Sequence, residues 1–196
     1  MIANFGFGAL VVALIVSIYG ICAAIHGART NSLAWVESAR KAMLLTFPLT
    51  SLVVLAIIVL LVGRHYEFQY VYSVTSNNMP LYLKITALWG GQAVSLFFWS
   101  WLMSAFASAV TLHKWDRDRE FLPWVIAVSL ITLAFFLLLS IFIENPFLRF
   151  WESATGMQMS AMFKPAGATL ITPFDGQGLN PLLRHPGMII HPPMLY

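Results

Sequence analysis

Four long stretches of the sequence contain no charged side chain, and this feature constrains the fold more than any other. They cover residues 5–25, 42–63, 85–112 and 121–143. A helix needs about 20 consecutive apolar residues to cross a bilayer. Each stretch therefore predicts one transmembrane helix, and residues 1–196 are expected to form a single all-α integral membrane domain.

The composition supports the same class. Charged residues make up only 10% of the chain, whereas soluble domains carry about 25%. The formal net charge of +3 therefore concerns the loops beside a membrane, and it is no indication of nucleic-acid binding. The first stretch is longer than a signal-peptide core and lacks a basic segment before it, so we expect it to be retained. Cys22 is the only cysteine, which excludes an internal disulfide or a CxxC redox pair.

Two long connections, residues 64–84 and 144–190, are expected on the same side of the membrane. In the first, residues 68–75 (FQYVYSVT) have the composition of a strand. Tyr82 and Lys84 are expected to anchor the following LYLKI run at the membrane interface. The second connection has many large apolar residues for a loop, so we expect it to pack on the membrane face of the bundle.

The distribution of basic residues predicts the orientation. The two short loops, 26–41 and 113–120, contain six Lys or Arg residues in 24 positions, whereas the two long connections contain five in 68. Loops rich in Lys and Arg stay in the cytoplasm. The N-terminus and both long connections are therefore expected outside.

The last stretch, DGQGLNPLLRHPGMIIHPPMLY, contains two histidines that each precede a proline, His185 and His191. The residue before a proline is pushed out of the α region, so His191 is expected to be the N-cap of a fifth helix that starts near Pro192. A helix N-terminus disfavours a charged imidazole, and neutral imidazole is the form that ligates metals. The residues alone leave two alternatives for His191, a metal ligand or a simple helix cap, and His185 fits a polar residue on a loop.

GLNPLLRHPGMIIHPPMLY resembles the corresponding stretch of the CcmF/NrfE-type haem lyases, membrane proteins of cytochrome c maturation. Residues 70–92, YVYSVTSNNMPLYLKITALWGGQ, and the Asn145-Pro146-Phe147 step are similar to the same family. The match departs at Ala93 and Val94, where the family has Glu followed by Gly. The tryptophan-rich motif that marks the family lies downstream of the His-Pro-Pro step, so the resemblance covers the N-terminal part only, as in a split-gene product or a truncated reading frame.

The resemblance implies a component of a haem lyase in the bacterial inner membrane, which binds haem b and positions it at the outer face for attachment to apocytochrome c. His191 is then implied to be an axial ligand of the haem iron, with His185 and Trp89 as further haem-binding candidates. The implied partners are haem, a haem chaperone, apocytochrome c and the remaining part of the lyase. For Trp89, ordinary aromatic packing is an equal alternative.

The sequence bears on two other classes of function. A transporter or proton-translocating subunit needs ionisable groups within its spans, and the four apolar stretches contain no Asp, Glu, Lys or Arg. A structural membrane subunit of an assembly or respiratory complex, without haem binding of its own, remains the alternative to the haem lyase.

Overall fold

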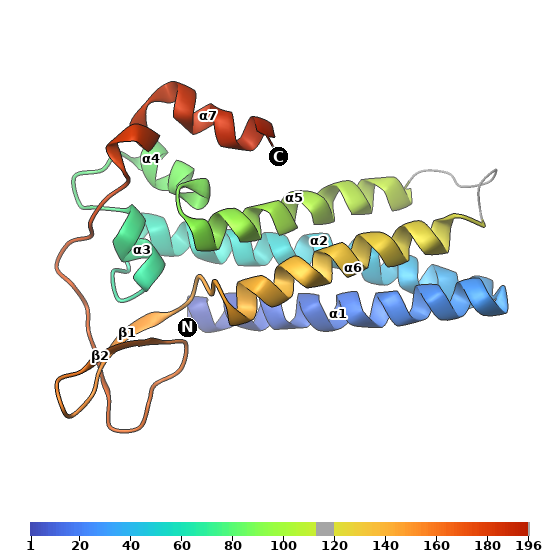
Figure 1. Cartoon of the computed structure of the whole chain (residues 1–196), viewed down its shortest axis with the longest axis horizontal. Coiled ribbons are helices and arrows are strands. Elements are labelled where there is room, and N and C mark those ends of the chain that lie inside the picture. The colour runs from blue at the N-terminus through green and yellow to red at the C-terminus, as the bar shows by residue number, and fades with distance from the viewer. Residues whose placement is uncertain (113–119, 196) are drawn as a thin grey trace.

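Four long helices run side by side in a computed structural model that describes residues 1–112 and 120–195 (Figure 1). They are α1 (Ile2–Thr30), α2 (Leu33–Val62), α5 (Gln92–Leu112) and α6 (Leu122–Phe142). Within this described part of the chain, these four helices are long and apolar enough to cross a membrane. The predicted all-α membrane fold with four spanning helices is therefore confirmed.

Small side chains bring the helices close together. The buried face of α1 is built largely from glycine, alanine and serine at helical spacing, including Gly6, Ala13, Ser17 and Gly20. In a membrane, small residues allow helix backbones to approach closely and gain van der Waals contact. Larger residues of the other helices, such as Leu130, fill the interior. The outward-facing side chains of the four helices are mostly apolar, as a lipid-facing surface requires.

The third span is shorter than predicted. The sequence suggested a continuous helix over residues 85–112, but α5 begins at Gln92, after the short helix α4 (Leu81–Thr86) and the 3-10 turn η1 (Ala87–Trp89). The glycine pair separates these elements. A Cβ atom at Gly90 would lie 2.5 Å from Leu179 Cδ1, and one at Gly91 would lie 2.8 Å from Tyr70 Cε2. The chain therefore needs glycine where two other segments approach it.

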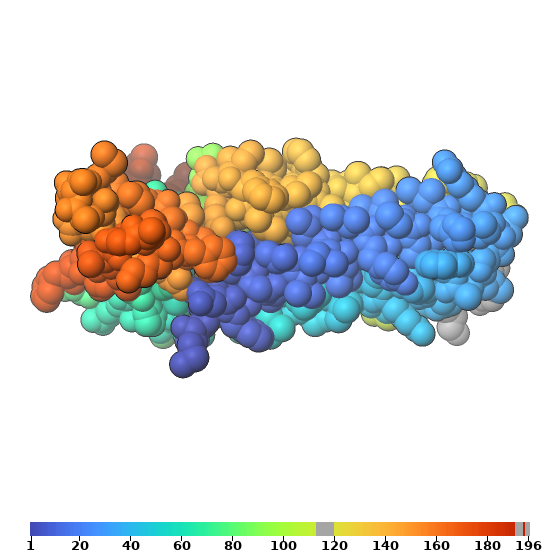
Figure 2. All heavy atoms as spheres, turned by 90° about the horizontal axis from the view of Figure 1, so that it is seen from below, coloured from blue at the N-terminus to red at the C-terminus, as the bar shows by residue number. Residues whose placement is uncertain are grey.

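The two long connections gather at one end of the bundle, which we call the sheet end (Figure 1). Strands β1 (Arg149–Glu152), β2 (Gln158–Ala161) and β3 (Thr169–Leu170) form an antiparallel sheet in the order β2-β1-β3. It lies beside the N-terminal end of α1, as Figure 2 shows, where Arg149 donates to Asn4 Oδ1 at 2.6 Å and the rings of Phe7 and Phe163 lie 5.9 Å apart. Trp151 and Met162 are buried there.

Residues 68–75 do not form the strand that their composition suggested, because Gln69–Val74 is a helix, α3. Its buried residues are Tyr70, Val71 and Val74, and a helix places positions separated by three and four residues on one face. Strand preference mainly reflects how a side chain fits a half-buried surface. Here the same β-branched and aromatic side chains are buried on one face of a helix.

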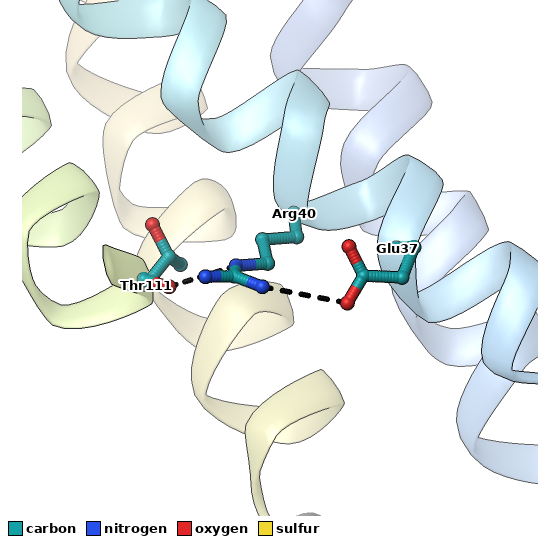
Figure 3. A network of polar contacts seen from close by, with 3 residues as sticks. All are labelled: Glu37, Arg40 and Thr111. Carbon is teal, nitrogen blue, oxygen red and sulfur yellow. Dashed lines mark hydrogen bonds and ion pairs between the residues drawn. The ribbon is translucent and has the colours of Figure 1, made fainter. Parts of the chain in front are cut away.

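At the opposite end, α2 caps α5. Arg40 Nε donates to the Thr111 carbonyl oxygen at 2.8 Å, and Arg40 Nη1 lies 3.4 Å from Glu37 Oε1 (Figure 3). The last carbonyl groups of a helix lack intrahelical donors, and a basic side chain there also interacts favourably with the helix dipole. Most of the predicted basic loop 113–120 lies outside the described residues.

Candidate functional site

Helix α7 (Pro186–Leu195) carries the predicted histidines and follows the 3-10 turn η2 (Pro181–Arg184). The amides of Met188 and Ile189 donate to the His185 carbonyl oxygen at 2.9 and 3.1 Å. The Gly187 amide donates to His185 Nδ1 at 3.2 Å. A side chain that accepts from the second helical N–H is an N-cap. His185 therefore caps α7, and Pro186 takes the first helical position, where its missing N–H costs nothing.

The predicted start of this helix near Pro192, with His191 as its N-cap, is wrong. The backbone of His191, Pro192 and Pro193 lies within α7. The prediction treated the two prolines as a boundary, because proline removes a backbone donor from a helix interior. The N-terminal position belongs instead to His185, whose Nδ1 accepts the capping bond.

Trp89 is brought against α7. Its indole Nε1–H donates to the Ile189 carbonyl oxygen at 3.0 Å. In a regular helix, that carbonyl accepts from the amide four residues later, and that residue is Pro193, which has no N–H. The indole therefore supplies the donor that proline removes, which is a physical reason why the His-Pro-Pro step can lie inside a helix. The sequence alone did not predict this role.

A row of aromatic rings continues from Trp89 into the bundle. The Trp89 and Phe98 ring centroids lie 5.5 Å apart, and those of Phe98 and Trp101 lie 5.6 Å apart. Trp101 Nε1 donates to Ser51 Oγ on α2 at 2.9 Å. Trp89 therefore connects α7 with α5 and α2, so its described contacts are those of a packed residue.

The segment before α7 is hydrogen-bonded to α3 and to the turn that follows α3. The amides of Gln177 and Gly178 donate to the carbonyl oxygens of Tyr72 and Thr75 at 2.8 and 3.1 Å. Asp175 Oδ1 accepts from the Asn77 amide at 2.7 Å. These contacts join parts of the chain about a hundred residues apart, and they bring α7 to the sheet end.

Lys84 does not anchor the membrane interface as predicted, because it is only 3% exposed. Burial lowers its pKa, and so does Arg64, while Asp175 acts in the opposite direction. Burial and Asp175 also raise the pKa of Tyr66. Tyr82, the other predicted anchor, is exposed. The sheet end therefore contains a buried lysine that hydropathy did not reveal.

A pocket of about 400 Å³ opens at the sheet end between α3, the start of α5 and the end of α6. Polar side chains of Gln69, Gln92 and Glu144 line it, together with Ala93. Ala93 is one of the two positions at which the sequence departs from the haem-lyase pattern. Glu144, which follows α6, contributes a carboxylate to the lining of this pocket.

Among the described residues, the side-chain donors do not form a site for a bare metal ion. No group of three His, Cys, Asp or Glu side chains in residues 1–112 and 120–195 could hold a metal ion. Haem needs only one or two axial side-chain ligands, of which histidine is the commonest. On α7, Ile190 and Met194 are exposed one helical turn apart, and Met188 is exposed on another side of the helix.

Comparison with known proteins decides the family. Residues 89–196 match the sequence pattern of a family described as cytochrome C assembly protein. This segment is more than half of the chain, and it contains Trp89, the fixed segment before α7 and α7 itself. The chain belongs to the cytochrome C assembly protein family.

Curated relatives within this family confirm the predicted resemblance to CcmF and NrfE. The cytochrome c-type biogenesis protein CcmF of Haemophilus influenzae is 29% identical over 196 residues, which cover all of this chain and 28% of that protein. The probable cytochrome c-type biogenesis protein NrfE of Escherichia coli K12 is 34% identical over 131 residues, or 67% of this chain and 20% of the relative. The chain thus spans less than a third of the length of these relatives.

A solved structure shares the fold. The structure titled cytochrome c haem lyase CcmF matches with a TM-score of 0.69 and 21% sequence identity, and the match covers 75% of this chain and 25% of that chain. The arrangement of the helices is therefore that of the membrane haem lyase, and this chain is a multi-pass membrane protein of the cytochrome c biogenesis family.

Proposed function

We propose that this chain is a component of a cytochrome c haem lyase and that it binds and positions haem b at the outer face of the bacterial inner membrane. The observation that supports this most strongly is the family match over residues 89–196, which includes the whole of α7. We further propose that the other partners are apocytochrome c, a haem chaperone and the remaining part of the lyase.

His191 is the axial ligand of the haem iron in this proposal. A neutral imidazole provides the lone pair that iron requires, and the exposed Ile190 and Met194, one turn apart on the same helix, provide apolar contact area. His185 has a different role, because its Nδ1 already accepts from the Gly187 amide. Haem itself supplies the reactive vinyl groups, so the protein contributes binding, orientation and the exclusion of competing contacts.

The test compares variants at the two histidines. We expect His191→Ala to abolish the Soret shift when haem is titrated into the purified chain, and to abolish cytochrome c maturation in cells that contain the rest of the lyase. His185→Asn is the matched control, because asparagine can also cap a helix. Added imidazole should partly restore the His191→Ala spectrum by filling the vacated ligand position.

Membrane levels of each variant, checked by blotting, separate loss of ligation from loss of protein. A His191→Ala variant that takes up haem with the wild-type spectrum would disprove the ligand assignment. A wild-type chain that causes no Soret shift would favour the alternative, a structural membrane subunit.

A further inference from the structure

We propose that Trp89 is a positioning residue for the His191-Pro192-Pro193 step, because its indole N–H replaces the backbone donor that Pro193 lacks. The effect of Trp89 on haem binding rests on the proposed function, whereas its effect on the stability of α7 does not. The family resemblance makes Trp89 a haem-binding candidate, but its hydrogen-bonding group is directed at the protein backbone.

The proposal begins with the hydrogen bonds of α7. Proline at position 193 leaves the Ile189 carbonyl oxygen without its regular helical donor. Ile189 is partly buried and packs against the core, so this carbonyl is poorly placed to bond to water instead. A buried acceptor without a partner costs free energy. The indole of Trp89, 3.0 Å away, satisfies it from outside the helix.

The donor itself is held in place. Trp89 ends η1, whose first residue, Ala87, accepts a 2.6 Å hydrogen bond from the buried hydroxyl of Tyr70. Its ring lies 5.5 Å from that of Phe98 on α5. The neighbouring Gly90 leaves room for Leu179 from the segment that leads into α7. A fixed donor gives the His-Pro-Pro step a fixed position on the bundle.

The other side chains of α7 that the structure describes are mostly exposed. The residues at its start, including Pro186, Gly187 and Met188, are exposed, and Met194 is exposed at the other end. Among the residues of α7 whose side chains the structure describes, Ile189 is the partly buried one. Because the Trp89 bond is made at this point, its loss is expected to free the part of the helix that contains His191.

A double-mutant cycle tests the inference on the full chain in lipid nanodiscs. Hydrogen–deuterium exchange of peptides from α7 is measured for Trp89→Phe, for Pro193→Ala and for the double variant. Phenylalanine keeps an aromatic ring but removes the N–H, so exchange should become roughly two- to tenfold faster, the range for one hydrogen bond. Pro193→Ala restores a backbone N–H to the Ile189 carbonyl, so the double variant should exchange close to the wild-type rate.

Trp124→Phe is the matched control, because Trp124 is an exposed tryptophan on α6, and it should leave α7 exchange unchanged. If the double variant exchanges as fast as Trp89→Phe, the indole acts only through packing and the inference is wrong. The inference is also overturned if Trp89→Phe leaves α7 exchange at the wild-type rate.

Haem titration of the same variants keeps this inference separate from the proposed function. We expect Trp89→Phe to weaken the His191-dependent Soret shift and Pro193→Ala to restore it. If wild-type protein shows no such shift but the exchange cycle behaves as predicted, the proposed function fails and the positioning role stands. If His191 binds haem but the exchange cycle shows no coupling, the positioning role fails alone.

Discussion

His185 has a structural role that its position before a proline did not reveal. The sequence suggested that His191 would be the cap, since two prolines follow it. The structure assigns the cap to His185, because Pro186 tolerates the first helical position and the Gly187 amide finds Nδ1 at 3.2 Å. Both histidines satisfy the same local rule, so the sequence around them could not distinguish the cap from a residue inside the helix.

Replacing His185 should separate capping from haem ligation. His185→Ala removes the acceptor for the Gly187 amide and should destabilise α7 by about 1 kcal/mol, the usual cost of losing a cap. His185→Asn should retain most of that stability. The measurement is the hydrogen exchange rate of the first turn of α7. Equal exchange in the alanine and asparagine variants would contradict the capping role.

At the scale of elements, the apolar stretches predicted the four long helices because membrane helices follow hydropathy and length. The sheet end was less predictable. Residues 69–74 have the composition of a strand but bury Tyr70, Val71 and Val74 as a helix. Lys84 is charged, yet the packing of α4 buries it. In both cases the structure depends on packing against segments distant in the sequence, which local composition does not predict.

Helix packing near the sheet end gives a sharp contrast between two glycines of α1. A Cβ atom at Gly6 would lie 2.9 Å from Ala56 Cβ and 2.7 Å from Phe147 Cζ, whereas one at Gly8 would meet nothing within 4 Å. Gly6→Ala should therefore destabilise the bundle by about 1–3 kcal/mol through overpacking. Gly8→Ala should be neutral or stabilising by up to about 1 kcal/mol, because alanine favours helix.

Thermal unfolding of the two variants in the same detergent checks this contrast. Gly6→Ala should have the lower midpoint, and Gly8→Ala should match or exceed the wild type. Equal midpoints for the two variants would show that α1 is not packed against α2 and Phe147 as closely as these distances require.

For the whole molecule, the candidate site is a property of the assembled sheet end. Trp89 precedes α5, the segment around Asp175 leads into α7, and α3 accepts hydrogen bonds from that segment. Sequence resemblance pointed to the His-Pro-Pro step and to Trp89 separately. Only the fold shows that the Trp89 indole donates to the Ile189 carbonyl oxygen and so completes the hydrogen bonding of α7.

Orientation in the membrane is the remaining prediction for the whole molecule. The sheet end has fewer basic residues per loop residue than the opposite end, and several of them, including Lys84 and Arg149, are engaged internally. Lys84 is buried, and Arg149 bonds to Met162 and Asn4 and stacks 5.0 Å from the centre of the Phe68 ring. By the positive-inside rule, the sheet end is therefore expected outside.

Reporter fusions test this orientation. An enzyme that is active only outside the membrane should be silent when fused at Asp116, in the basic loop between α5 and α6. The same reporter fused at Thr155, in the exposed turn between β1 and β2, should be active. Fusion levels must be matched by blotting, since an unstable fusion is also silent. Activity at Asp116 with silence at Thr155 would reverse the orientation, and it would put His191 on the side opposite to the proposed site of haem attachment.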